Sequence, residues 1–102
     1  MQMLTKEIIL DTLKKNRTKI KEVGVKKLIL FGSYALDKQK GNSDIDFLVE
    51  YKKGRGNYRD SLDLLHFLED IFQKKIDLGE KNSIRKEFKS YILGSVQYEA
   101  TI

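Results

Sequence analysis

Two aspartates one residue apart stand at the start of an apolar run near the middle of the chain. Asp44 and Asp46 flank Ile45 and lead into the run Phe47–Val49. Because side chains alternate across a strand, the two carboxylates would share one face and the apolar residues the other. Like charges this close repel each other strongly where solvation is poor. The pair therefore favours a bound counter-charge, and hard divalent cations with oxygen ligands are the natural one.

Two carboxylates on one face can bridge two such ions roughly 4 Å apart, the arrangement used for in-line displacement at phosphorus. Two other interpretations stay open for Asp-x-Asp alone: a pair of exposed aspartates that caps a loop, and a Ca²⁺ loop. An EF-hand loop needs a glycine and further ligands at set positions, and the apolar run Phe47–Val49 excludes them.

A third aspartate lies in the short run Lys75–Gly79, which we expect to be a strand. The alternation that turns Ile76 and Leu78 toward a core turns Asp77 away from it. If this strand is a neighbour of the one that begins at Asp44, the three carboxylates converge on one open face.

A Gly-Ser pair precedes these aspartates by ten residues. Gly32 and Ser33 follow an apolar run and precede a predicted helical turn, so backbone N–H groups and a hydroxyl would face a positive helix end. That geometry suits a triphosphate, and glycine lets the backbone approach the anion closely. A simple strand-to-helix turn with a serine cap is the plainer alternative.

The elements that must position these residues can be read from hydrophobic spacing and capping signals. They indicate a small α/β domain with helices packed on a sheet of three strands or slightly more. The expected elements are a helical region Leu4–Val23 interrupted at Asn16, a strand Leu28–Phe31, one or two helical turns at Ser33–Asp37, a polar loop Lys38–Ser43, a strand Asp44–Tyr51, a basic connector to Asp60, a helix Ser61–Phe72 capped by Asp60 or Ser61, the strand Lys75–Gly79, a basic helix Ser83–Leu93 and a C-terminal tail.

The bulk composition is that of one globular domain. The chain has 102 residues, with 40% hydrophobic and 34% charged residues. No apolar run approaches the ~20 residues of a membrane span, and we expect no signal peptide. Without cysteine there is no disulfide framework or thiolate metal site. We expect a cytoplasmic protein. Its net charge of +5 and pI near 9.4 favour anionic partners, such as nucleotides, nucleic acid or an acidic protein.

The joint pattern resembles a known family. Gly32-Ser33, ten residues and Asp44-Ile45-Asp46 resemble the signature of nucleotidyltransferases of the DNA polymerase β superfamily. The flanking sequence LILFGSYA…NSDIDFLVEY is similar to that of the minimal nucleotidyltransferase (MNT) group. The resemblance covers nearly the whole chain and implies the polymerase β-like fold, a small mixed sheet flanked by helices.

The resemblance also implies a reaction and roles for particular residues. Gly32 and Ser33 would hold the β- and γ-phosphates of ATP, and Asp44 and Asp46 would bind two Mg²⁺ ions. Asp77 matches the third carboxylate, a metal ligand that helps to activate the acceptor hydroxyl. The implied reaction is attack of that hydroxyl on the α-phosphorus of ATP, with release of pyrophosphate.

One position departs from the family pattern Gly-Ser-x-Ala-Arg-Gly. This chain has Leu36 where the family has arginine, so one cation near the phosphates is missing. Lys38, Lys40 or the loop Lys52–Arg55 are the candidate substitutes.

The resemblance further implies a partner, because larger relatives carry a helical domain for which this length leaves no room. MNT proteins of this type pair with a HEPN-domain RNase toxin, and the expected acceptor is a tyrosine hydroxyl of that toxin. This makes the chain an antitoxin that binds the toxin in a hetero-oligomer and neutralises it by AMP transfer. Two alternatives stay open: an idle MNT fold that neutralises by binding alone, and a nucleotidyltransferase that acts on RNA or a small molecule.

Overall fold

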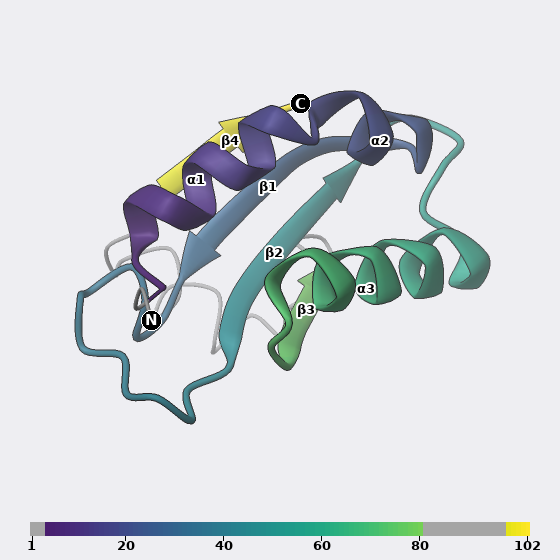
Figure 1. Ribbon diagram of the computed structural model, residues 1–102. Helices are drawn as coiled ribbons and strands as arrows, with labels where there is room; N and C mark the ends of the chain where they lie inside the picture. Colours follow the sequence, from purple (N-terminus) through teal and green to yellow (C-terminus); the bar gives the residue numbers. More distant parts are fainter. Residues whose placement is uncertain (1–3, 81–97) are drawn as a thin grey trace, which may run out of the picture.

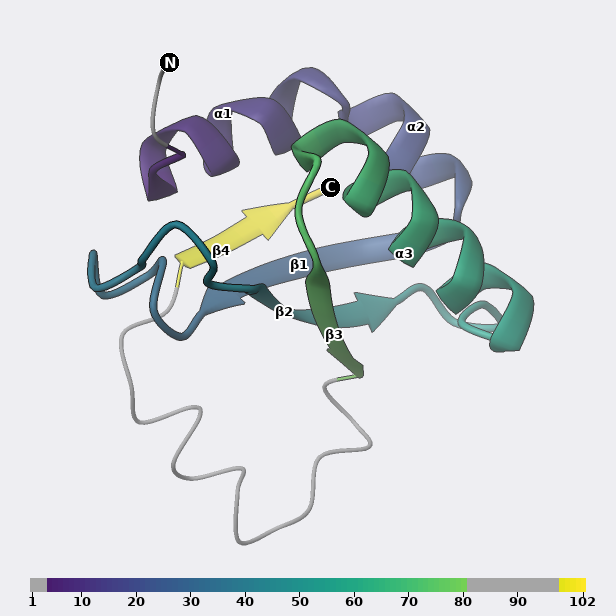
Figure 2. The same ribbon diagram turned by 60° about the horizontal axis from the view of Figure 1, so that its bottom comes forward.

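The computed structural model describes residues 4–80 and 98–102. Their elements form a four-stranded mixed sheet in the order β3-β2-β1-β4, with the helices on one face (Figures 1 and 2). Strand β1 pairs antiparallel with β2 and with β4, and β2 pairs parallel with β3. The bounds are α1 (Lys6–Lys15), α2 (Arg17–Glu22), β1 (Val25–Phe31), β2 (Ile45–Tyr51), α3 (Tyr58–Phe72), β3 (Ile76–Glu80) and β4 (Tyr98–Thr101). The predicted fold class is confirmed.

The helical region before the first strand is divided at Asn16, as expected. Helix α1 begins after Thr5, whose Oγ1 accepts a hydrogen bond from Ile8 N at 3.3 Å. Asn16 ends α1 and precedes α2, and its side chain donates to Thr12 O at 2.8 Å. An amide side chain that bonds the preceding turn suits a break between two short helices. The two helices place Ile20 and other apolar residues on the sheet.

Strand β1 is longer than expected and begins with a bulge. Val25 pairs with Tyr51, but Lys27 pairs with Glu50, so Lys26 is an extra residue on β1. The extra residue shifts the alternation, and Val25 and Leu28 therefore both face the core, each 0% exposed. The bulge lets one strand keep its apolar side on the helices along its whole length.

Helix α3 begins earlier than predicted, and its cap differs. It starts at Tyr58, and the capping residue is Asn57, whose Oδ1 accepts from Asp60 N at 2.8 Å. The prediction of Asp60 or Ser61 as N-cap was therefore wrong. Asp60 is instead buried, and it pairs with Arg55, which is possible because the helix starts one turn sooner.

The C-terminal residues form a strand, so the predicted tail was wrong. Tyr98 pairs with Leu30 and Ala100 with Leu28, which makes β4 the edge of the sheet beside β1. Tyr98, Ala100 and Ile102 pack against the core. Tyr98 is therefore partly buried. The helix expected at Ser83–Leu93 lies outside the described residues.

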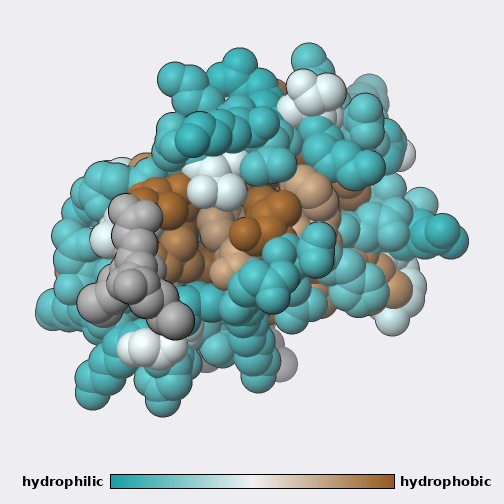
Figure 3. Space-filling model, in the orientation of Figure 1, coloured by the Kyte–Doolittle hydropathy of each residue, from teal (hydrophilic) through white to brown (hydrophobic). Residues whose placement is uncertain are grey.

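The core lies between the helices and one face of the sheet. Phe47 of β2 is fully buried, and its ring centroid is 6.1 Å from that of Phe72 in α3. Apolar surface reaches the outside in the centre of this face, between α1 and α3 (Figure 3). Partly buried side chains of both helices, including Leu10 and Leu65, pack against the core. None of the helices in the described part of the chain is long and apolar enough to cross a membrane.

Candidate functional site

The sheet topology places the Gly-Ser turn beside two of the predicted carboxylates. Asp46 is the register partner of Phe31 on one side and of Asp77 on the other. Gly32 directly follows Phe31, so it lies next to Asp46. Since Ile45 and Phe47 face the helices α1, α2 and α3, Asp46 faces the opposite side of the sheet. The expectation that the second and third strands are neighbours is confirmed.

Gly32 touches the Asp46 side chain. Its φ of +76° lies in the left-handed region, which an L-residue rarely adopts. A Cβ added at Gly32 would collide with Asp46 Oδ2 and would lie 3.0 Å from Asp46 Cγ. Glycine is thus required here for two reasons, the backbone conformation and the room for the carboxylate. The sequence indicated only the backbone's close approach to an anion; the contact with Asp46 depends on strand register.

Ser33 begins an irregular turn, where helical turns were expected. Lys38 N donates to Ser33 O at 2.9 Å, and Leu36 N lies 3.2 Å from both Gly32 O and Ser33 O. The turn does not continue as a regular helix, because Asp37 adopts a left-handed φ of 58°. Tyr34, which follows Ser33, is 1% exposed and fixes the turn to the core.

The carboxylates influence one another. The pKa of Asp46 is raised to about 6, first by burial, then by the negative charges of Asp77 and Asp44, and by hydrogen bonding with Asp77. Asp44 lies just before β2 and is partly buried, whereas Asp77 in β3 is exposed. The structure therefore brings together Gly32, Asp46 and Asp77, with Asp44 close enough to repel Asp46 electrostatically.

The donor chemistry of this cluster fits a hard divalent cation. Carboxylate oxygens are the ligands that Mg²⁺ prefers, and a cation would relieve the repulsion that raises the pKa of Asp46. Within residues 4–80 and 98–102, however, no group of three or more potential ligands is already placed to hold a metal. Asp44, Asp46 and Asp77 are therefore not arranged as one preformed site with three protein ligands.

The loop between Ser33 and Asp44 is held by one ion pair and two hydrogen bonds that the sequence did not reveal. Lys6 Nζ lies 3.0 Å from Asp37 Oδ2. Gln39 Nε2 donates to Leu4 O at 3.3 Å, and Lys74 Nζ donates to Gly41 O at 2.9 Å. All three link residues more than 30 positions apart, so no local pattern could have indicated them.

The predicted replacements for the missing arginine differ in position. Leu36 itself is 42% exposed. Lys38 and Lys40 lie on the loop that follows the Gly-Ser turn, but Lys52–Arg55 follows β2 at the opposite end of the sheet from Gly32 (Figure 1). The suggestion that Lys52–Arg55 supplies a cation near the Gly-Ser turn was therefore wrong, because β2 separates the two.

Arg55 is engaged in a separate cluster at that far end. Its Nε and Nη2 donate to the two Asp60 oxygens, each at 3.1 Å, and Nη2 also donates to Glu22 O at 3.2 Å. Gly56 N donates to Asp60 Oδ2 at 2.9 Å. The Arg55 hydrogen bonds, followed by that of Gly56, lower the pKa of Asp60 to about 2. The cluster joins the connector to α3.

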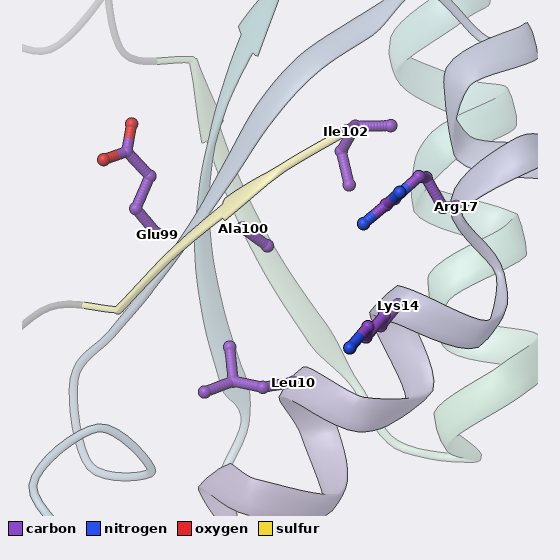
Figure 4. A pocket seen from close by; sticks show the side chains of 6 residues that line it. All are labelled: Leu10, Lys14, Arg17, Glu99, Ala100 and Ile102. Atoms are coloured by element: carbon purple, nitrogen blue, oxygen red, sulfur yellow. The ribbon is translucent and has the colours of Figure 1, made fainter.

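Two hollows lie away from the Gly32–Asp46 contact. One, of about 230 Å³, lies between α1, α2 and β4, with Lys14 and Arg17 reaching over an apolar floor that includes Leu10 and Ala100 (Figure 4). The other, of about 350 Å³, lies between α2 and α3 and includes His66 and Arg55 in its lining. Neither hollow is lined by any of the five predicted site residues.

Comparison with known proteins supplies relatives of nearly equal length. "Putative protein adenylyltransferase MJ1215" of Methanocaldococcus jannaschii is 40% identical over 84 residues, which cover 81% of this chain and 96% of that protein. Protein adenylyltransferase MntA of Thermococcus cleftensis is 30% identical over 99 residues, covering 96% of this chain and 99% of its own.

Solved structures share the fold. A crystal structure of a toxin–antitoxin with AMP-PNP matches 94% of this chain and 72% of that chain, with a TM-score of 0.65 and 23% identity. A tri-AMPylated HEPN toxin of Shewanella oneidensis in complex with MNT antitoxin gives a TM-score of 0.54 at 20% identity, over 84% of this chain and 69% of that one.

The family model for the nucleotidyltransferase domain matches residues 9–99, a span that contains Gly32, Ser33 and all three aspartates. The resemblance seen in the sequence is thereby confirmed. The chain belongs to the nucleotidyltransferase domain family.

Proposed function

We propose that this nucleotidyltransferase is the antitoxin of a HEPN/MNT pair and that it transfers AMP from ATP to a tyrosine hydroxyl of its HEPN toxin. The observation that carries the proposal is the contact of Gly32 with Asp46, whose register partner is Asp77. This contact brings a turn suited to phosphate and a carboxylate cluster suited to divalent cations to one end of the sheet. The relatives named as protein adenylyltransferases, and the AMPylated HEPN toxin bound to an MNT antitoxin, support the acceptor class.

In this proposal the Gly-Ser turn holds the β- and γ-phosphates of ATP. Gly32 has no side chain to keep the phosphates away, and Ser33 contributes a hydroxyl and backbone N–H. Asp44, Asp46 and Asp77 are the residues that would hold two Mg²⁺ ions. When bound, the ions neutralise phosphate charge and so favour displacement at the α-phosphorus.

The chemistry is a substitution at phosphorus. The tyrosine oxygen forms a bond with the α-phosphorus, the bond from that phosphorus to the oxygen bridging to the β-phosphorus breaks, and pyrophosphate leaves. The hydroxyl proton passes to a carboxylate of the cluster, for which we propose Asp77, and from there to water. Little covalent chemistry is required of the protein, since positioning accounts for much of such catalysis.

The partner would complete the site and receive the product group. Asp77 lies on the face of the sheet opposite α1, α2 and α3, and within the described part of the chain it is exposed, so it is accessible to a second protein. An AMP group on a tyrosine adds negative charge and bulk, which would repel an RNA substrate from the toxin.

Intact mass spectrometry tests the proposal. The protein encoded beside this gene is weighed before and after incubation with this protein, ATP and Mg²⁺. We expect a gain of one or more AMP units, and complete loss of that gain in the Asp44→Asn/Asp46→Asn double variant. A matched control, Asp63→Asn/Asp70→Asn, removes the same charge from exposed positions of α3 and should transfer AMP normally.

The opposite result is equally informative. A stable complex without any gain in mass would contradict AMP transfer and would favour neutralisation by binding alone. The exposed Leu36, in place of the family arginine, would then be the first position to restore.

A further inference from the structure

The turn after Gly32 is closed by backbone hydrogen bonds, of which the one from Lys38 N to Ser33 O is the shortest. Its last residue, Asp37, has a left-handed φ of 58°. A non-glycine residue in that region costs about 1 kcal/mol or more, and a side-chain contact outside the turn helps to offset this cost. The side chain of Asp37 makes such a contact.

That contact comes from the first residue of α1. Lys6 Nζ lies 3.0 Å from Asp37 Oδ2, and it also lies 5.3 Å from the centroid of the Tyr98 ring. Tyr98 is the register partner of Leu30, two residues before Gly32. Lys6 thus joins α1, β4 and the turn close to the end of β1.

The position of Lys6 is not explained by the needs of its own helix. A cation at the first position of a helix meets the positive end of the helix dipole and is disfavoured there. Thr5 already caps the helix, so α1 does not need the lysine side chain. The Lys6 side chain is only 21% exposed, and hydrogen bonding to Asp37 and then Tyr98 raises the pKa of Lys6.

We propose that Lys6 is a positioning residue for nucleotide binding: through Asp37 it holds the Gly32–Ser33 turn in the geometry that receives the phosphates of ATP. This inference rests on the proposed function, since it assigns the turn to ATP. Lys6 does not touch the nucleotide in this account, and its effect reaches the phosphates only through Asp37.

The test measures the dissociation constant of Mg²⁺-ATP by calorimetry and the AMP-transfer rate at saturating ATP, with the full chain and its HEPN acceptor. Lys6→Met and Asp37→Asn should each weaken ATP binding about three- to fivefold, the range of a partly exposed ion pair. The double variant should be no weaker than either single one, because both remove the same contact. Lys6→Arg should restore binding, and the rate at saturating ATP should change little.

Two further variants separate positioning from general stability. Lys15→Met breaks another ion pair of α1, Lys15 Nζ to Asp11 Oδ2 at the same 3.0 Å, and should bind ATP as the wild type does. Asp37→Gly suits the left-handed backbone, so it should keep the thermal stability while binding ATP as weakly as Lys6→Met does.

Each outcome decides between the claims. Unchanged ATP binding in Lys6→Met and Asp37→Gly, or additive effects in the double variant, would overturn the positioning role while leaving AMP transfer intact. A wild-type chain that binds no ATP would instead overturn the proposed function, and the positioning role with it.

Discussion

At the scale of single residues, Gly32 and Asp46 depend on each other. The glycine adopts a left-handed backbone and leaves room for the carboxylate, which in turn carries a raised pKa because it is buried among other negative charges. A side chain introduced at Gly32 would therefore move the Asp46 carboxylate and change its pKa.

Replacement of Gly32 by alanine tests this dependence. We expect Gly32→Ala to lose about 1–2 kcal/mol of unfolding free energy from the left-handed backbone alone, and to displace the Asp46 carboxylate and abolish AMP transfer. Urea unfolding and the mass assay measure the two effects. The control is Gly41→Ala, where an added Cβ meets no atom within 4 Å. Equal unfolding midpoints for Gly32→Ala and wild type would contradict the requirement for glycine at this position.

The raised pKa of Asp46 gives a second prediction. In metal-free protein, NMR should find that Asp46 titrates near pH 6, and Asp77→Asn should lower this pKa, because the repulsion and hydrogen bond from Asp77 disappear. Burial remains, so the pKa should stay above 3.8. The variant Asp63→Asn, on the exposed side of α3, should leave the Asp46 titration unchanged.

The same pKa affects stability in metal-free protein. Because folding raises the pKa of Asp46, the folded state binds more protons between pH 3.8 and about 6. The contribution of Asp46 to stability therefore falls as the pH rises through this interval. A bound divalent cation should reverse the loss.

At the scale of elements, the end of the molecule far from Gly32 is held by the cluster that joins the connector to α3. Asp60 receives hydrogen bonds from Arg55 and Gly56, while Asn57 caps the helix. The basic connector thus has a structural role, since Arg55 donates hydrogen bonds to Asp60 and to Glu22 O at the end of α2.

The low pKa of Asp60 predicts the pH dependence of this cluster. Folding lowers that pKa from 3.8 to about 2, so the stabilisation is present above pH 3.8 and disappears as the pH falls toward 2. Asp60→Asn should lower the melting temperature by several degrees at pH 7, and the difference from wild type should vanish near pH 2. Asp63→Asn, which loses only a 3.7 Å surface pair with Arg59, should change the melting temperature little. A constant difference at every pH would show that Asp60 acts without its charge.

Strand β4 is an element whose conformation depends on its neighbour in the sheet. Tyr98, Ala100 and Ile102 alternate with Glu99 and Thr101, but five residues are too short a pattern to separate a strand from a tail. Pairing with β1 decides the matter, because Leu28 and Leu30 offer both backbone partners and an apolar surface.

At the scale of the whole molecule, the charged groups are separated by the length of the sheet. The carboxylate cluster lies where β1 ends and β2 begins, and the Arg55–Asp60 cluster lies at the other end (Figure 1). The net charge of +5 indicated an anionic partner but not a place for it. Only the topology shows that Lys52–Arg55 and the Gly-Ser turn are too far apart to act on one phosphate group.

By itself, the sequence determined the candidate site residues, the family and most of the elements. Residue types and spacing along the chain are enough for the Gly-Ser turn, the Asp-x-Asp pair, the break at Asn16 and the alternation that turns Asp46 and Asp77 away from the core. Those features depend on local backbone geometry and residue spacing, which do not require knowledge of the tertiary contacts.

The tertiary structure alone decided which of these residues meet. The parallel pairing that sets Asp46 against Asp77, the contact of Gly32 with Asp46, the tie from Lys6 to Asp37 and the edge strand β4 all join residues far apart in sequence. Such contacts follow from strand order and register, which arise when all the apolar faces are buried at once. No local stretch of sequence contains that information.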